Sequence, residues 1–296
     1  MNARLLDGKV AVITGAGNGL GRAYAIQLAN EGAAVVVNDY LAASADDVVR
    51  EIHAIGGKAV AVTADVGKLE SGQQILAVAL AAFGKVDILV NNAGILRDRS
   101  LLKMEEADWD EVVRIHLKGT YAVTRPVFAH MKTSGAGGVI VNTTSTSGLR
   151  GKFGQSNYGA AKAGIWGFSN TLAQEGLKYG IRVWTIAPAA ISQMTDELVT
   201  EEYKQTFTPE SVATVLLYMV SSLSGNRTGK TLLAGGGYVG ELRMEVGPGV
   251  VPSSGFTARD LAIAVEQGHV FLPERELNFV NAYGPVIKPV TKPVIG

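Results

Sequence analysis

The stretch "KVAVITGAGNGLG", residues 9–21, joins a short β-branched run to a glycine-rich turn. The apolar run is typical of a buried strand. Because the glycines lack side chains, the turn can approach a pyrophosphate closely, and the amides at the start of a following helix can hold it. The spacing departs from the usual Gly-x-Gly-x-x-Gly fingerprint, and many such turns are only turns. Its place after a first strand nevertheless predicts dinucleotide binding. The predicted cofactor residues of this turn are Gly15, Asn18, Gly19 and Leu20.

Further β-branched runs follow, each separated from the next by an amphipathic segment. They are "AAVVVND", "KAVAVTADV", "VDILVNN", "GGVIVNTTS", "IRVWTIAP" and "TLLAGG". This alternation predicts an α/β fold, a doubly wound parallel sheet of about seven strands (Rossmann). We expect a single domain over residues 1–245 and a C-terminal extension over residues 246–296, with one helix in 256–270 and an extended Pro-rich end.

Composition excludes several classes of function. The 27 basic and 27 acidic residues cancel, so no global charge favours nucleic acid or an anionic membrane as a partner. The absence of cysteine removes disulfides, thiolate nucleophiles and zinc-thiolate sites, and it fits a reducing compartment. No signal-peptide pattern or apolar run long enough for a membrane span is present, which predicts a cytoplasmic location.

Asp39 ends the second predicted strand, 18 residues after Gly21. An acidic group at this point can accept hydrogen bonds from both hydroxyls of an adenosine ribose, and it would repel a 2′-phosphate. The sequence therefore predicts NAD rather than NADP as the cofactor. The alternative is a solvated aspartate after a strand.

Ser145, Tyr158 and Lys162 form the predicted catalytic group. The tyrosine and lysine stand four residues apart, so both lie on one face of a helix. A nearby ammonium and the positive nicotinamide would lower the pKa of the phenol, which could then take the proton of an alcohol while Ser145 holds the same oxygen. Each residue alone has a structural explanation, but their combination with the glycine turn favours catalysis.

These motifs, with "NNAG" at residues 91–94 and "IAPAAISQMT" at residues 186–195, resemble the short-chain dehydrogenase/reductase family over residues 5–240. The resemblance implies that "NNAG" packs beneath the cofactor, that Asp65 contacts adenine and that the segment after Pro188 contacts nicotinamide. The usual Pro-Gly of the family is Pro188-Ala189 here. The residues that the resemblance adds to the cofactor site are Asp65, Val66, Asn91, Ala93, Gly94, Tyr158, Lys162, Pro188 and Ile191.

His116 stands where most family members have asparagine, which anchors a water in a proton relay from the lysine. Histidine at this place, with "HLKGTYAVTR" and "FGQSNY", resembles the (3R)-hydroxyacyl-CoA dehydrogenase group of the family. The resemblance implies a catalytic role for His116, while its helical spacing also allows a packing role. No other histidine forms a ligand-spaced motif with it, so we expect no metal site.

The leading hypothesis is an NAD-dependent dehydrogenase of a secondary alcohol, a 3-hydroxyacyl-CoA, with a hydroxysteroid dehydrogenase as the alternative. A catalytically silent NAD-binding sensor or scaffold is the alternative from another class. The segment 195–210 is a candidate lid. Basic residues near strand ends could attract coenzyme A phosphates, or serve structure instead. They are Arg97, Arg99, Lys103, Arg150 and Lys152.

Self-association is also expected. The segment 105–132, predicted as one helix, and the helix from Tyr158 are apolar beyond one face, and relatives use such helices to form homodimers and homotetramers. The tail places Leu261, Ile263, Val265, Val270, Phe271, Leu272, Phe279 and Val280 where burial would be favourable. It could cover the substrate mouth of the same subunit or the core of a neighbouring one, and we expect it to dock on a neighbouring subunit.

Overall fold

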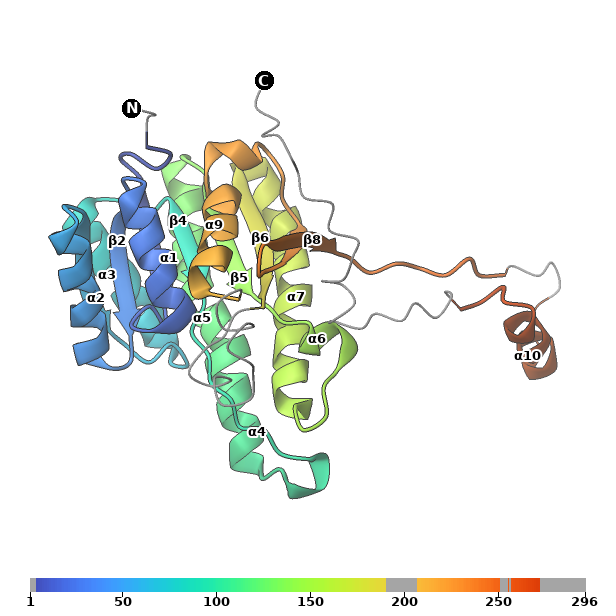
Figure 1. Cartoon of the computed structure of the whole chain (residues 1–296). Coiled ribbons are helices and arrows are strands. Elements are labelled where there is room, and N and C mark those ends of the chain that lie inside the picture. The colour runs from blue at the N-terminus through green and yellow to red at the C-terminus, as the bar shows by residue number, and fades with distance from the viewer. Residues whose placement is uncertain (1–3, 190–206, 251–254, 256, 272–296) are drawn as a thin grey trace. The chain divides into compact units, whose positions relative to one another are not determined.

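The computed structural model describes residues 4–189, 207–250, 255 and 257–271. Its contacts divide the chain into two compact units, Met1–Leu242 and Arg243–Gly296. The sheet lies wholly within the first unit (Figure 1).

The first unit is built on one sheet of eight strands in the order β3-β2-β1-β4-β5-β6-β7-β8. Seven strands are parallel and β8 is antiparallel to β7. The strand order reverses between β1 and β4, and a crevice opens at the carboxyl ends of the strands at such a point. The predicted doubly wound fold is confirmed. The strands are β1 Val10–Thr14, β2 Ala34–Asp39, β3 Lys58–Thr63, β4 Ile88–Asn91, β5 Gly138–Thr143, β6 Ile181–Pro188, β7 Lys230–Gly235 and β8 Tyr238–Leu242.

An antiparallel eighth strand, β8, follows the seven parallel strands that were expected. Gly236 and Gly237 form a two-residue connection between β7 and β8, with φ of 57° and 80°. Positive φ at both positions suits the tight hairpin turn that joins antiparallel strands. The strand was missed because its residues are half-buried at best, so they lack the apolar run of a central strand.

Helices cover both faces of the sheet (Figure 1). α1, α2 and α9 pack on one face through side chains such as Leu28, Val48 and Leu216. α3, α5 and α7 pack on the other. The helices of the first unit are α1 Gly19–Asn30, α2 Ala42–Ala54, α3 Leu69–Phe83, α4 Glu106–Val113, α5 Gly119–Ser134, α6 Ser147–Arg150, α7 Ser156–Gly176 and α9 Pro209–Val220, with 3-10 turns at Leu101–Lys103, Leu177–Tyr179 and Ser222–Ser224.

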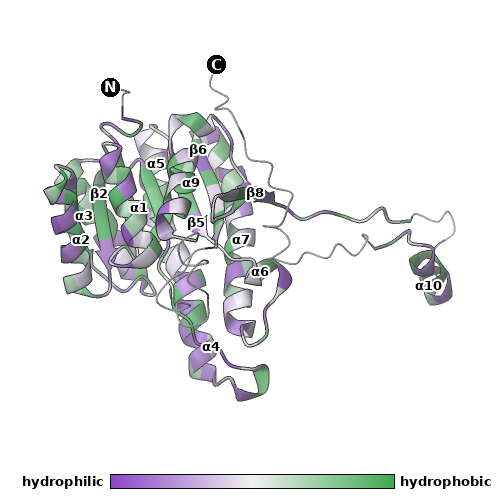
Figure 2. Cartoon of the chain, viewed as in Figure 1, coloured by the Kyte–Doolittle hydropathy of each residue, from purple (hydrophilic) through white to green (hydrophobic). Residues whose placement is uncertain are grey.

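Burial on two faces explains the continuous apolar runs of the strands. In β1, Ile13 joins the core beneath α1, and Val12 joins the core beneath α3 and α5. Figure 2 shows the same strands as the hydrophobic centre of the unit. The sheet core therefore fixes the strand ends, from which the site is built.

The predicted helix over residues 105–132 is interrupted. α4 ends at Val113, a π-helical turn covers Arg114–Lys118, and α5 begins at Gly119. A π turn accommodates one extra residue within a helix and is common at functional sites. The turn contains His116, which is buried.

The second unit contains α10, Ala258–Glu266, within the region predicted as a helix. Thr257 and Asp260 form a capping box at its start. Leu261, Ile263 and Phe271 are exposed, whereas Leu272, Phe279 and Val280 lie outside the described residues. The predicted docking of the tail stays a prediction.

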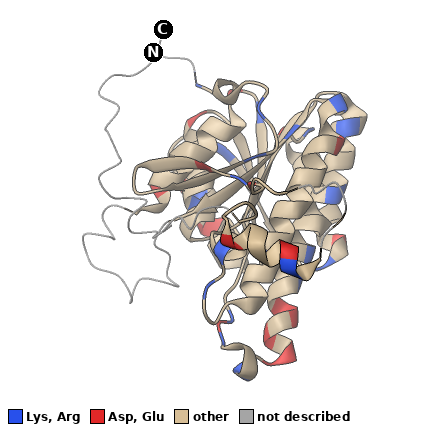
Figure 3. Cartoon of the chain, turned by 90° about the vertical axis from the view of Figure 1, so that its right-hand side faces the viewer, with Lys and Arg blue, Asp and Glu red and all other residues tan. Residues whose placement is uncertain are grey.

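Charges of both signs are scattered over the elements drawn in Figure 3. Within the described part of the chain, no helix is both long and apolar enough to span a membrane.

Candidate active site

The glycine turn between β1 and α1 leaves backbone amide groups without side chains over them. Gly15 and Gly19 have positive φ, and a side chain on Gly15 would come within 2.7 Å of the Cα of Ala93. No side chain caps the start of α1, where Asn18 precedes the helix. Its first amides are therefore available to an anion. A Cβ at Gly19 would meet no atom within 4 Å, so the approach to these amides is open, and the turn fits a pyrophosphate.

Asp39 lies at the carboxyl end of β2, beside the glycine turn. Its carboxylate is buried and accepts hydrogen bonds from the amides of Gly17, at 3.0 Å, and Leu41, at 3.1 Å. Each oxygen accepts one of these bonds and keeps further acceptor capacity. The carboxylate is thus held in place with acceptors to spare, which fits a ribose diol.

Asp65 follows β3 and is also fixed on both oxygens. It accepts from the amide of Gly67 at 3.0 Å and from Arg114 at 2.8 Å. The same guanidinium donates to Glu111, and these two carboxylates raise the pKa of Arg114. Arg114 was missed from the sequence. It holds the carboxylate that is predicted to reach adenine.

The "NNAG" segment supports the glycine turn from the end of β4. The side chain of Asn91 is buried and donates to Thr124 and Asn142, so it faces the core beneath the site. Asn92, which belongs to the same motif, donates 3.1 Å hydrogen bonds to the carbonyls of Thr14 and Gly15. These bonds anchor the glycine turn.

Ser145 and Tyr158 meet at the carboxyl end of β5. Ser145 follows that strand and Tyr158 lies in the first turn of α7, where the Ser145 side chain is close enough to the phenol to lower its pKa. The Ser145 oxygen also accepts a hydrogen bond from the amide of Ser147 at 3.2 Å. Because that amide supplies its own proton, the hydroxyl proton of Ser145 can point toward the phenol oxygen.

Burial raises the pKa of Tyr158 above its usual value of 10, and the charge of Asp98 adds to the rise. The hydrogen bond from Ser145 works in the opposite direction. In the protein without cofactor, the desolvation of the phenolate therefore outweighs the contacts that favour it, and the lowering expected from Lys162 and the nicotinamide together stays a prediction.

Lys162 is buried one helical turn beyond Tyr158. Its Nζ donates to the carbonyl oxygen of Thr143 at 2.6 Å and lies 5.5 Å from the centroid of the Tyr158 ring. Burial lowers its pKa to about 7, so the side chain is only partly charged at neutral pH.

His116 packs edge to face against Tyr158, with 5.2 Å between the ring centroids. Its Nε2 lies 3.0 Å from the amide nitrogen and 2.7 Å from the carbonyl oxygen of Ile95. Its Nδ1 is buried without a described hydrogen-bond partner. Burial first, and then the charge of Lys162, lowers its pKa to about 3. His116 is therefore a neutral imidazole that packs against Tyr158 and is hydrogen-bonded to the backbone of the loop after β4.

The short-chain dehydrogenase family model matches residues 9–204, more than half of the chain. This chain belongs to the short-chain dehydrogenase family. The resemblance inferred from the sequence is confirmed, and the family is one of oxidoreductases.

Relatives of known name lie within this family. The chain is 45% identical over 248 residues to the peroxisomal multifunctional enzyme type 2 of Mus musculus, which covers 81% of this chain and 33% of the relative. It is 36% identical over 244 residues to the 3-oxoacyl-(acyl-carrier-protein) reductase of Thermotoga maritima, which covers 79% of this chain and 99% of that protein. The chain spans 28% to 56% of the length of the first multifunctional relatives.

A solved structure of a short chain dehydrogenase from Mycobacterium avium superposes with a TM-score of 0.82 at 36% identity. The match covers 91% of this chain and 98% of that chain.

The departure from the Pro-Gly of short-chain dehydrogenases is accommodated by the backbone. Pro188 ends β6, and the amide of Ala189 donates to the carbonyl of Ala234 at 2.7 Å. No described non-glycine residue has positive φ, so Ala189 needs no left-handed conformation. The predicted nicotinamide contact at Ile191 and most of the candidate lid lie outside the described residues.

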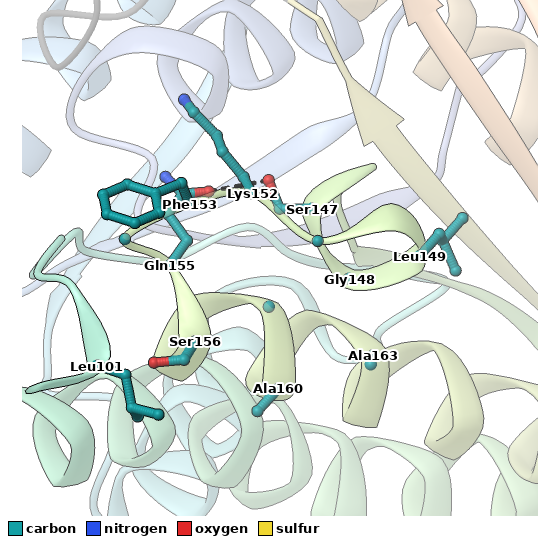
Figure 4. Close-up of a pocket in the computed structure, with 13 residues that line it drawn as sticks. Leu101, Ser147, Gly148, Leu149, Lys152, Phe153, Gln155, Ser156, Ala160 and Ala163 are labelled. Carbon is teal, nitrogen blue, oxygen red and sulfur yellow. Dashed lines mark hydrogen bonds between the residues drawn. The ribbon is translucent and has the colours of Figure 1, made fainter. Parts of the chain in front are cut away.

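A pocket of 480 Å³ lies beside the site, between α6, the loop that follows it and the start of α7 (Figure 4). Ala160 and Ala163 line it from the face of α7 opposite Tyr158, which is not among its lining residues. Lys152 contributes to this pocket. All five of the basic residues that were predicted near the strand ends, at the opening of the substrate site, are exposed. They are Arg97, Arg99, Lys103, Arg150 and Lys152.

Proposed function

We propose that this protein is an NAD-dependent dehydrogenase that transfers hydride between a 3-hydroxyacyl-CoA and NAD. The observation that carries the proposal is the meeting of Ser145, Tyr158 and Lys162 at one end of the sheet. The turn that fits a pyrophosphate follows β1 at the same edge, since parallel strands end together.

Tyr158 acts as the acid or base. In alcohol oxidation its oxygen takes the proton of the substrate hydroxyl, while Ser145 donates a hydrogen bond to the same substrate oxygen. When bound, NAD supplies the hydride acceptor. Because burial raises the pKa of Tyr158, oxidation should speed up as the pH rises, and the protonated phenol is ready to act as the acid in the reverse direction.

Asp39 supports the choice of NAD. Its carboxylate is fixed by two backbone amides, so it cannot easily turn away from a 2′-phosphate. A phosphate at that point would meet the negative charge at close range.

The names of the relatives support the substrate class. One is a multifunctional enzyme of peroxisomes and another reduces a 3-oxoacyl group on a carrier protein. The exposed basic residues near the strand ends could form ion pairs with the phosphates of coenzyme A. We also propose self-association as a homodimer or homotetramer and a cytoplasmic location.

The test is to supply NAD with both epimers of 3-hydroxyacyl-CoA thioesters and a set of hydroxysteroids, and to follow NADH. We expect turnover of one thioester epimer. Tyr158→Phe should retain cofactor binding but lose about two to four orders of magnitude in kcat. Turnover of hydroxysteroids without turnover of either thioester would show a hydroxysteroid dehydrogenase instead of a 3-hydroxyacyl-CoA dehydrogenase. Binding of NAD without turnover of any alcohol would favour a sensor.

A further inference from the structure

A chain of polar contacts runs beside the catalytic pair and centres on Gln155, one residue before α7. Gln155 is 5% exposed. Its Nε2 donates to the Oδ2 of Asp98 at 2.8 Å, and its Oε1 accepts from the hydroxyl of Ser147 at 2.9 Å. Figure 4 shows the pair formed by Gln155 and Ser147.

Asp98 sets the orientation of this amide. An ionised carboxylate only accepts hydrogen bonds, so the amino group of Gln155 must face Asp98 and its oxygen must face Ser147. The Ser147 hydroxyl therefore donates to Gln155. A buried amide is costly to leave without partners, which keeps the arrangement in place.

From Ser147, this series of polar contacts continues to the catalytic serine. The amide of Ser147 donates to the oxygen of Ser145 at 3.2 Å, and the Ser145 side chain acts in turn on Tyr158, whose pKa it lowers. Anchoring Ser147 thus fixes the turn after β5 from which the Ser145 hydroxyl points.

We propose that Gln155 is a positioning residue that holds Ser145 aimed at Tyr158 by anchoring Ser147, with Asp98 fixing the direction of its amide. The inference rests on the proposed roles of Ser145 and Tyr158. It adds a link between the loop after β4, which carries Asp98, and the loop after β5. The titratable groups that face Tyr158 among the described residues are Lys162, His116 and Asp98.

The first test is Gln155→Leu, which keeps a similar volume and removes both hydrogen bonds. We expect kcat to fall by about tenfold or more, because small displacements of reacting groups are costly. The KM for NAD should not change. Ser147→Ala should show a similar loss, and the double variant should be little worse than either one, as expected for residues that act through one contact. Gln174→Leu, on an exposed position of α7, is the matched control.

A rescue experiment tests which partner donates in the hydrogen bond between Gln155 and Asp98. Gln155→Glu alone places a second carboxylate against Asp98 and should lose activity. In the double variant with Asp98→Asn, the new amide at position 98 donates to the new carboxylate at position 155, which is the reverse of the native hydrogen bond. This variant should recover part of the lost kcat. Absence of any recovery would contradict the proposal.

A readout without turnover separates this proposal from the proposed function. The Cζ signal of Tyr158 in protein labelled with 13C-tyrosine, assigned with Tyr158→Phe, reports the titration of the phenol. Loss of an aligned Ser145 should move this titration to higher pH in Gln155→Leu, because the hydrogen bond from Ser145 lowers the pKa. An unchanged titration and an unchanged kcat in a folded variant would overturn the proposal. A shifted titration in a protein that oxidises no alcohol would support it while rejecting the function.

Discussion

Lys162→Met should stabilise the protein without cofactor at neutral pH while removing most of its turnover. The lysine is fully buried, and burial lowers its pKa from 10.5 to about 7. The unfolded chain therefore binds more protons than the folded chain between these two values. The resulting penalty is fully present below pH 7 and is lost as the pH rises toward 10.5.

The size of the effect follows from this difference. At about 1.4 kcal/mol per pH unit, the penalty is on the order of 4 kcal/mol at pH 7 and about 1 kcal/mol at about pH 9.5. Methionine removes the penalty, but it also removes the hydrogen bond to Thr143, which is worth about 1 kcal/mol. We expect a net gain of about 3 kcal/mol at pH 7 and almost none at about pH 9.5.

Urea unfolding at both pH values, without cofactor and at one fixed protein concentration, measures the gain. Lys118→Met, at an exposed position, is the control for removing a positive charge. Equal or lower stability of Lys162→Met at pH 7, or a gain that does not change with pH, would refute the reasoning.

Five further predictions concern the cofactor site, the imidazole and the assembly. Asp39→Asn should raise the KM for NAD and relax discrimination against NADP; a protein that already prefers NADP would contradict the assignment. Gly94→Ala should destabilise the protein, because its Cβ would clash with the His116 ring, whereas a Cβ at Gly167 meets nothing within 4 Å, so Gly167→Ala should be tolerated in a parallel thermal melt. Since burial lowers the pKa of His116 to about 3, the pH profile of kcat should have the same inflections between pH 5 and 8 in His116→Asn as in the unchanged protein, and an inflection that disappears in the variant would show the histidine titrating. Light scattering should detect a dimer or tetramer at micromolar concentration, and deletion of residues 246–296 should weaken that assembly more than NAD affinity; a monomer, or an unaffected assembly, would reject these two expectations.

The sequence predicts the central strands well because strands covered on both faces are continuous apolar runs. It predicts the edge less well, although the Gly236-Gly237 pair was a usable hairpin signal for β8. The π turn left no signal, since Arg114–Lys118 continues an ordinary helical pattern.

Within the site, local spacing was sufficient to place Tyr158 and Lys162 together. It could not find the contact of Arg114 with Asp65 or that of Gln155 with Asp98, because these partners lie 49 and 57 residues apart in the chain. Residue spacing also does not reveal that burial raises the pKa of Tyr158 in the protein without cofactor.

The π turn at Arg114–Lys118 takes up one residue more than an ordinary helical turn, so the side chains of α4 and α5 keep the facing of a continuous helix on either side of it. Removing one residue from the turn would let an ordinary helix form without rotating α4. α5 has no extra residue to lose, so a deletion there would rotate everything before it by about 100°, and Arg114 would leave Asp65, which lies on a different loop and cannot follow. This helical segment should therefore tolerate a one-residue shortening at the π turn better than one in α5, and substitutions better than either.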